Sequence, residues 1–272
     1  MKRVTVIPNQ YKDREMKCLF ELCSFLREKR VDFVVPLEYR QYITFDGINF
    51  TNTPYDTELV IVIGGDGSII KAAIPAALAG IPLVGINMGK VGYMASIEPD
   101  DLSPLAKVLD GDHLTEERTM LKICTDSGVY YALNDAVISN GGSARLVDIE
   151  LNCNGLHVSR YYADGIIIAS PTGSTAYSLS AGGPVIDPLL DCMCATPICP
   201  HSLTARPLVF SGDSVLQVCS SIPGRSLYLS IDGGEYISLG ADEQVEIVKS
   251  EYKLKLIKTE EQSFCALLNN KL

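Results

Sequence analysis

The chain has 272 residues, of which 47% are hydrophobic and 21% charged, and its formal net charge is −10 at pH 7. That length is enough for one large domain or for two smaller domains with cores of their own. The acidic balance argues against nucleic acid as the main partner, because proteins that bind the phosphate backbone are usually basic. No apolar run reaches the roughly 20 residues of a membrane span, and the first residues resemble a strand rather than a secretory leader, so we expect no membrane partner.

The cysteines bear on the cellular compartment and on metal binding. The chain has nine, an odd number without a Cys-x-x-Cys pair, which favours reduced thiols and a cytoplasmic location. The densest run, residues 192–199, lacks the ligand spacing of a usual zinc site, so we expect its thiols to be core residues. The sequence therefore assigns no metal ligand.

The first part of the chain alternates apolar strands with helices. A helix capped by Asp13 follows the first strand, and a second helix starts at Ser68 and ends by Gly80, with Pro75 as a kink or break. Strands are expected at residues 3–7, 31–35, 59–63 and 81–87. This alternation predicts an α/β domain over residues 1–110, with a parallel sheet covered on both faces.

After about residue 110 the pattern changes to β-like runs separated by glycine, asparagine and aspartate. These runs cover residues 121–125, 129–138, 147–153, 157–162, 165–169, 215–219, 227–231 and 245–256. Their spacing predicts an all-β, sandwich-like second domain over residues 111–256. The C-terminal tail, residues 257–272, is apolar enough for us to expect it to return to the first domain.

The glycine turn after the strand at 59–63 is the most informative motif. It is Gly64-Gly65-Asp66-Gly67, and it opens a helix. Glycines let the backbone approach a ligand closely, and the free N–H groups of a helix N-terminus favour an anion. The spacing is that of neither a P-loop nor a Gly-x-Gly-x-x-Gly dinucleotide turn. A carboxylate beside an anion site suits removal of a proton from a hydroxyl that attacks phosphorus, which indicates a phosphotransferase with Asp66 as general base.

Two polar motifs lie in the second half. Residues 164–184 form an apolar strand followed by a turn rich in hydroxyls and glycines, which suits hydrogen bonding to a nucleotide. Alternatively, Thr172, Ser174 and Thr175 only cap a short helix. The second motif is Asn134-Asp135, a polar pair within the apolar run 129–138. Buried polar groups cost about 1–3 kcal/mol each without partners, so this pair either receives ribose hydroxyls or is satisfied within a turn.

These motifs, together with residues 200–207, stand in the order and at roughly the spacing found in NAD kinases, which the whole chain resembles. Gly-Gly-Asp-Gly alone is shared with phosphofructokinases and lipid kinases, whereas the long glycine and hydroxyl block is more specific. The resemblance implies a Rossmann-like N-terminal domain, a β-rich C-terminal domain and a site between them. It also implies transfer of the γ-phosphoryl group of ATP, or of polyphosphate in some members, to the adenosine ribose 2′-hydroxyl of NAD.

The same resemblance implies a role for individual residues. Asp66 would accept the proton and Gly67 would help to hold the substrate. Asn134 and Asp135 would bind the adenosine part of NAD. The nicotinamide side would contact Asp164, Thr175, Ala176, Tyr177 and Ser178, and further lining candidates are Thr172, Ser180 and Cys199. A divalent ion, usually Mg²⁺, is expected to accompany ATP.

Two basic residues are further candidates for phosphate contacts. Lys71 lies on the first turns of the helix after Asp66, and Arg145 lies in a loop after the Asn-Asp run. The alternative for each is a solvated surface charge. The resemblance also implies a homodimer or homotetramer.

Three positions depart from the family pattern. Asp135 stands where glutamate is common, Tyr162 where a basic residue is common, and Gly234 where a longer polar residue often follows Asp-Gly. Three rival functions remain: a non-catalytic NAD(P) or nucleotide sensor, a lipid kinase of the diacylglycerol type, and a phosphatase acting on NADP. The acidic charge disfavours the lipid kinase, which would work at a membrane surface.

Overall fold

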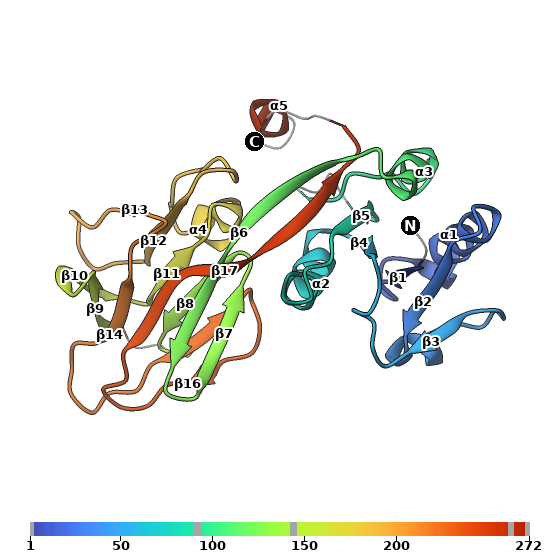
Figure 1. Ribbon diagram of the computed structural model, residues 1–272. Coiled ribbons are helices and arrows are strands. Elements are labelled where there is room, and N and C mark those ends of the chain that lie inside the picture. The colour runs from blue at the N-terminus through green and yellow to red at the C-terminus, as the bar shows by residue number, and fades with distance from the viewer. Residues whose placement is uncertain (1–2, 90–93, 142–145, 261–263, 270–272) are drawn as a thin grey trace. The chain divides into compact units, whose positions relative to one another are not determined.

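The computed structural model describes residues 3–89, 94–141, 146–260 and 264–269 (Figure 1). The chain divides into two compact units: residues 1–117 with 254–272 form unit 1, and residues 118–253 form unit 2. Two long strands, β6 (Leu114–Thr125) and β17 (Val245–Lys258), contribute residues to both units. Within the described ranges, no helix combines the length and the apolar character needed to cross a membrane.

Unit 1 is built on a parallel sheet (Figure 1). Its strands, in spatial order, are β3 (Asn49–Thr51), β2 (Asp32–Pro36), β1 (Arg3–Ile7), β4 (Leu59–Gly64) and β5 (Leu83–Asn87). Every pair along this path is parallel, and Leu256 of β17 pairs in parallel with Leu83 of β5. The order β3-β2-β1-β4-β5 is that of doubly wound dinucleotide-binding folds. The Rossmann-like domain is therefore confirmed.

Helices cover both faces of this sheet. On one face, α1 (Lys17–Glu28) and α3 (Ser103–Asp110) pack with alternate residues of β1, β4 and β5 in a single core cluster. On the other face lies α2 (Asp66–Leu78), since a side chain on Gly85 of β5 would clash with Ile69. All residues of β4 and β5 are buried, as expected for strands covered on both faces.

The observed starts and ends of helices α1 and α2 can be compared with those predicted from the sequence. Asp13 is buried, and its carboxylate accepts hydrogen bonds from the N–H groups of Cys18 and Leu19, both at 2.9 Å. It therefore caps the first turn of α1 across the 3₁₀ turn η1 (Arg14–Met16), as predicted. Of the two alternatives for Pro75, a kink or a break, the break is wrong, because α2 continues through Pro75 to Leu78 and ends before Gly80 as predicted. The bond from Ala79 N to the carbonyl of Pro75, at 3.1 Å, holds the last turn in place.

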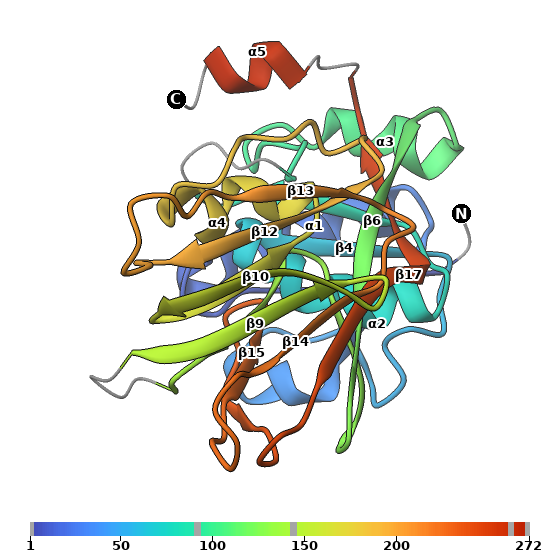
Figure 2. The same ribbon diagram turned by 90° about the vertical axis from the view of Figure 1, so that its left-hand side faces the viewer.

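Unit 2 contains two β-sheets (Figure 2). One has the order β13 (Leu208–Ser211), β12 (Cys192–Ile198), β11 (Gly165–Ala169), β8 (Asp135–Ser139), β15 (Tyr228–Ile231) and β16 (Ile237–Ser238). The other contains β10 (Leu156–Ala163), β9 (Val147–Cys153), β14 (Leu216–Ser220) and the first part of β17, with β6 paired to β7 (Gly128–Ala132). Buried residues of both sheets form one core, among them Ile138 and Ile166 from the first and Ile149 and Leu216 from the second. The sandwich-like, β-rich domain is confirmed.

Two details of unit 2 differ from the sequence prediction. The run 129–138 is not one strand but two, β7 and β8, which belong to different sheets and are separated at Leu133 and Asn134. The cysteine-rich run contains β12, in which Cys192 and Cys194 are buried as expected, whereas Cys199 is exposed. The remaining helices are η2 (Leu37–Tyr42), η3 (Thr172–Thr175), α4 (Tyr177–Ser180) and α5 (Phe264–Asn269).

Candidate active site

In unit 1 the glycine turn joins the end of β4 to the start of α2. Gly65 is extended at the helix N-cap and Asp66 is the first helical residue. A Cβ on Gly64 would lie 2.3 Å from Ser68 Oγ, so only glycine fits there. Ser68 Oγ accepts a hydrogen bond from Asn9 Nδ2 at 2.8 Å, which ties the turn to the loop after β1.

Asp66 is half-buried and its carboxylate is oriented by the backbone. Its Oδ1 accepts a hydrogen bond from Met94 N at 3.1 Å. Gly67 beside it is exposed and has no neighbour within 4 Å of an added Cβ, so its backbone is open to a ligand. Lys71, just over one helical turn further on, is exposed and lines a cavity together with Gly67. The turn therefore presents a fixed carboxylate beside an open helix N-terminus, where backbone N–H groups favour anions.

In unit 2 the Asn134-Asp135 pair is held by Asp232, from the turn after β15. The Asp232 carboxylate accepts hydrogen bonds from the N–H groups of Leu133 at 2.8 Å, Asn134 at 2.7 Å and Asp135 at 3.0 Å. These three bonds end β7 and start β8. The side chains of Asn134 and Asp135 are thereby free for other partners, although both are buried.

The electrostatics of this pair are unusual. Burial, and then the charge of Asp232, raises the pKa of Asp135 to about 7. Burial also raises the pKa of Asp232, although its three backbone hydrogen bonds oppose that effect. Among the described residues, Asn134 Oδ1 and Thr172 Oγ1 are buried polar atoms without a hydrogen-bond partner. Such atoms are uncommon in folded proteins, so these two oxygens are candidates for contact with a ligand.

The hydroxyl-rich turn after β11 packs against the backbone of this pair. Ser170 Oγ donates to the carbonyl of Leu133 at 2.5 Å, and Ser170 N donates to that of Asn134 at 2.8 Å. A Cβ on Gly173 would lie 2.1 Å from the carbonyl oxygen of Asn134. The turn therefore packs directly on the backbone of Leu133 and Asn134 and is hydrogen-bonded to it.

The remaining hydroxyls of that turn have different surroundings. Ser174 Oγ donates to the carbonyl of Pro171 at 2.7 Å and accepts from Ile186 N at 3.0 Å, so it holds the turn. Thr175 Oγ1 contacts the carbonyl of Thr172 at 3.4 Å. Ser178 is buried with its Oγ 2.9 Å from Thr196 Oγ1. Ser174 thus bonds within the turn, although neither η3 nor α4 has a side-chain cap hydrogen bond, and Thr172 Oγ1 has no hydrogen-bond partner among the described residues.

Tyr177 is electrostatically coupled to other predicted residues. It is 46% exposed, and burial followed by the charges of Cys199, Tyr236, Asp164 and Asp135 raises its pKa. The charges of these four residues therefore act within electrostatic range of the Tyr177 hydroxyl. Asp164 joins β10 to β11. Ala176 is half-buried and Ser180 is exposed, at either end of α4. Arg145 lies outside the described residues.

Three functional candidates were missed by sequence reasoning. Asp232 holds the Asn134-Asp135 pair, and Ser170 holds the turn against it. The sequence feature that could have identified Asp232 is the Asp-Gly-Gly run after a strand. This run forms a turn in which Asp232 has φ +49° and Gly233 has φ +72°. The third is Lys12, whose Nζ would lie 2.6 Å from a Cβ on Gly65. Lys12 comes from the loop after β1, and no local motif marks it.

The chain is similar in sequence to known proteins. Residues 4–113 match the ATP-NAD kinase N-terminal domain family and residues 133–259 match the ATP-NAD kinase C-terminal domain family. An NAD kinase of Natranaerobius thermophilus is 36% identical over 280 residues, covering 100% of this chain and 98% of the relative. An NAD kinase of Geobacter metallireducens is 33% identical over 278 residues, with coverage of 100% and 98%.

Two solved structures have the same fold. Yeast NADH kinase complexed with NADH has a TM-score of 0.87 at 24% identity, covering 99% of this chain and 86% of that one. An NAD kinase from Archaeoglobus fulgidus in complex with ATP has a TM-score of 0.76 at 23% identity, covering 98% of both chains. At these identities the likeness establishes the two-domain architecture.

Proposed function

The chain belongs to the NAD kinase family, and we propose that it transfers the γ-phosphoryl group of ATP to the adenosine ribose 2′-hydroxyl of NAD. In this proposal Asp66 is the general base. The observation that carries it is the Asp66 carboxylate, fixed by Met94 N–H in the first turn of α2 beside the open backbone of Gly67. A base needs such a fixed position to take a proton as the hydroxyl attacks, while the helix N-terminus favours the phosphoryl oxygens.

The acceptor would be held by unit 2. Asn134 Oδ1 and Thr172 Oγ1 are buried and lack partners among the described residues, so hydroxyl and amine groups of adenosine would satisfy them. Asp135, whose pKa is about 7, would receive a ribose hydroxyl either as donor or as acceptor. Asp164, Thr175, Ala176, Tyr177, Ser178, Ser180 and Cys199 are proposed for the nicotinamide side and the rest of the dinucleotide pocket. Asp232 would act as a positioning residue, through its bonds to the backbone of Leu133, Asn134 and Asp135.

The side chains that could bind a metal ion bear on how Mg²⁺ would be held. In phosphoryl-transfer sites Mg²⁺ keeps several waters and binds one or two carboxylates together with the substrate phosphates. Among the described residues no three His, Cys, Asp or Glu side chains gather into a metal site. We propose an ion that arrives with ATP, and Asp66, in the first turn of α2, is the carboxylate proposed to contact it. Such an ion would neutralise charge on the transferred phosphoryl group.

A homodimer or homotetramer and a cytoplasmic location are also proposed, because the family resemblance and the thiol content favour them. Size-exclusion chromatography with light scattering tests the first. A monomer at the concentration used for activity assays would contradict it.

The activity is tested with the purified full chain, NAD, ATP and Mg²⁺. NADP formation is followed with a coupled NADP-specific dehydrogenase. Asp66→Asn keeps the shape of the side chain and removes the base, so we expect kcat to fall by about 10²- to 10⁴-fold. The dissociation constant of NAD should stay within about twofold. Asp112→Asn, an exposed carboxylate elsewhere in unit 1, is the matched control.

Turnover of Asp66→Asn close to that of the wild type would overturn the assignment of the base. NAD binding without NADP formation from either ATP or polyphosphate would favour the sensor. NADP formed from polyphosphate alone would replace ATP as the donor.

A further inference from the structure

A buried lysine is connected to the proposed base through one residue. Lys258, the last residue of β17, is only 5% exposed. Lysine is almost never fully buried without a partner, because taking an ammonium group out of water costs free energy that hydrogen bonds must offset. The Nζ of Lys258 donates to the carbonyl of Met94 at 3.4 Å. The reaction described so far assigns this lysine no role, and the residue that accepts its bond indicates one.

Met94 is held at both of its backbone polar atoms. Its N–H donates to Asp66 Oδ1 at 3.1 Å, and its carbonyl accepts the bond from Lys258. Met94 is itself buried, at 3% exposed. The orientation of the Asp66 carboxylate therefore depends on the position of the Met94 N–H, and that position depends on what holds Met94.

Two further bonds fasten the same segment to the end of β17. Ser96 Oγ donates to the carbonyl of Ile257 at 3.2 Å, and Thr259 Oγ1 donates to the carbonyl of Ser96 at 3.0 Å. We call these two bonds and the bond from Lys258 to Met94 the β17 clamp. Because its three side chains come from both segments, the clamp fixes them against each other.

Strand β5 anchors both segments of the clamp. Leu256 of β17 pairs in parallel with Leu83, at the start of β5. On the other segment, the N–H groups of Ser96 and Ile97 both donate to the carbonyl of Gly85, at 3.1 and 3.2 Å. The clamp is therefore attached to the central sheet of unit 1, which gives Met94 a fixed position.

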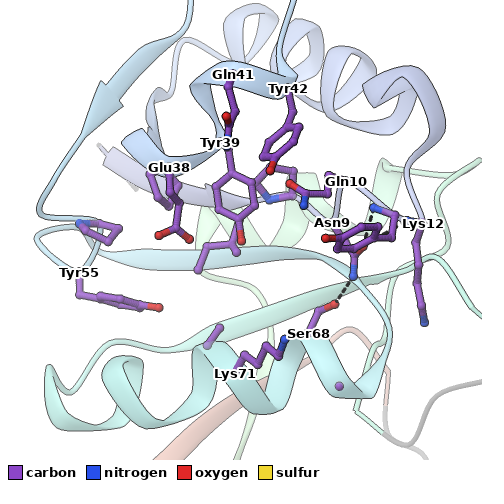
Figure 3. Close-up of a pocket in the computed structure, with 17 residues that line it drawn as sticks. Asn9, Gln10, Lys12, Glu38, Tyr39, Gln41, Tyr42, Tyr55, Ser68 and Lys71 are labelled. Atoms are coloured by element: carbon purple, nitrogen blue, oxygen red, sulfur yellow. Dashed lines mark hydrogen bonds between the residues drawn. The ribbon is translucent and has the colours of Figure 1, made fainter. Parts of the chain in front are cut away.

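The helix that carries Asp66 has a separate anchor. Figure 3 shows the bond from Asn9 Nδ2 to Ser68 Oγ, 2.8 Å long, at the wall of a cavity in unit 1. This bond fixes the first turn of α2 but does not involve the carboxylate of Asp66. Asn9 thus positions the helix, whereas Met94 positions the side chain.

We propose that Lys258 is a positioning residue for the general base. It fixes the Met94 carbonyl, so that the Met94 N–H holds the Asp66 carboxylate in the orientation needed for proton transfer. An ammonium group suits this task, because hydrogen bonds from charged donors are stronger than those between neutral groups. Lys258 touches neither substrate in this assignment. The inference rests on the kinase activity and the base proposed above, and it adds a residue 164 positions after Met94 to the machinery around that base.

The first experiment measures steady-state kinetics with the full chain. Lys258→Met keeps the length and the apolar stem of the side chain and removes the ammonium group. We expect kcat to fall by about 10-fold or more, because small displacements of a catalytic group have effects of that size. The KM values for NAD and ATP should stay within about twofold, since the change affects the transition state alone. Lys255→Met, at an exposed position of the same strand, is the matched control and should leave kcat unchanged.

A double-mutant cycle separates positioning from a purely structural role. If Lys258 acts through Asp66, adding Lys258→Met to Asp66→Asn should change kcat by less than about twofold. A lysine that only stabilises the fold would lower the activity by the same factor in both backgrounds. Equal factors, or an unchanged kcat in Lys258→Met alone, would overturn the proposal. Urea unfolding checks that each variant is folded, and we expect Lys258→Met to fold because replacing a buried charge by an apolar group removes its desolvation cost.

The second experiment does not depend on turnover. Hydrogen exchange of the Met94 amide is followed by NMR in protein labelled with ¹⁵N-methionine. The chain has six methionines, and Met94→Leu identifies the resonance of Met94 by its loss. Because the Met94 N–H is bonded to Asp66, we expect its exchange to be at least about 10-fold faster in Lys258→Met than in the wild type or in Lys255→Met.

The two proposals fail in different ways. An exchange rate of Met94 that is the same in Lys258→Met and in the wild type would overturn the positioning role and leave the kinase activity in place. Absence of NADP formation by the wild type would instead contradict the proposed reaction. The exchange rates would then still decide whether Lys258 holds Met94 against Asp66.

Discussion

Asp232 and Asp135 are joined by two hydrogen bonds. Asp135 N donates to Asp232 Oδ1, and Asp232 N donates to the carbonyl of Asp135, both at 3.0 Å. The same carboxylate also accepts the N–H groups of Leu133 and Asn134. A single side chain thus positions the start of β8, and its charge lies beside the carboxyl group of Asp135.

Replacing Asp232 should reduce both stability and activity. Asp232→Ala leaves three backbone N–H groups without their acceptor, at about 1–3 kcal/mol for each buried donor. Asp232→Asn keeps one carbonyl oxygen, which can still accept the N–H groups of Asn134 and Asp135. We therefore expect Asp232→Ala to lower the free energy of unfolding by several kcal/mol, and Asp232→Asn by less. Urea unfolding measures both.

The positioning role has a separate test. In Asp232→Asn the KM for NAD should rise more than kcat falls, because the side chain holds the proposed adenosine ligands and has no role in proton transfer. A fall in kcat with an unchanged KM would contradict this role. Asp242→Asn, at another exposed turn of unit 2, is the control.

The carboxyl group of Asp135 makes stability depend on pH. In the unfolded chain its pKa is near 3.8, whereas in the folded protein burial and Asp232 raise the pKa to about 7. Between these values the folded protein keeps a proton that the unfolded chain releases. The stabilisation is therefore complete below about pH 4 and is lost as the pH rises toward 7. Asp135→Asn lacks this dependence.

The measurement is urea unfolding of wild type and Asp135→Asn at pH 5 and pH 8. The stability of the wild type relative to the variant should fall over this interval by on the order of 2 kcal/mol. A difference between the two proteins that is constant over that range would show that Asp135 titrates normally in the folded state.

Local sequence patterns were sufficient to predict much of the fold. The predicted strands at residues 3–7, 147–153 and 165–169 have the same bounds as β1, β9 and β11. Each is a run of apolar or alternating residues bounded by turn residues, so its structure follows from its own sequence. The glycine turn that opens a helix was predicted for the same reason, although α2 begins at Asp66, two residues before the predicted start at Ser68.

The break between β7 and β8 could not be predicted in this way. The N–H groups of residues 133–135 bond to Asp232, which lies 97 to 99 residues later in the chain. The local alternation of apolar and polar residues gives no information about so distant a partner. The run 129–138 therefore resembled one strand. The cavity of unit 1 that Asn9, Tyr39 and Tyr55 help to line could not be predicted for a similar reason, because its walls come from four segments separated in sequence.

Gly67→Ala should separate stability from activity. Gly67 is the second residue of α2, and an added Cβ would meet nothing within 4 Å. Because alanine favours helix over glycine by about 1 kcal/mol, the free energy of unfolding should stay the same or rise. If substrate approaches this backbone closely, kcat/KM should fall by about 10-fold or more, since the methyl group would occupy that space. Gly80→Ala is the converse control, because Gly80 has φ +70° and its replacement should cost stability but not activity. Full activity in Gly67→Ala would show that no ligand contacts this position.

Alkylation of Cys199 should report on the dinucleotide site. Cys199 is the exposed cysteine among the eight whose side chains are described. Burial raises the pKa of Cys18 and Cys23 to about 12 and also raises those of Cys192 and Cys194, so these thiols should react slowly. N-ethylmaleimide should therefore modify Cys199 first, as mass spectrometry of tryptic peptides would show. Because the charge of Cys199 acts on Tyr177 and both are proposed to line the dinucleotide pocket, saturating NAD should slow this reaction by about fivefold or more. The half-buried Cys153 on β9 should react at the same rate with and without NAD. Equal rates for Cys199 in the two conditions would remove it from the proposed pocket.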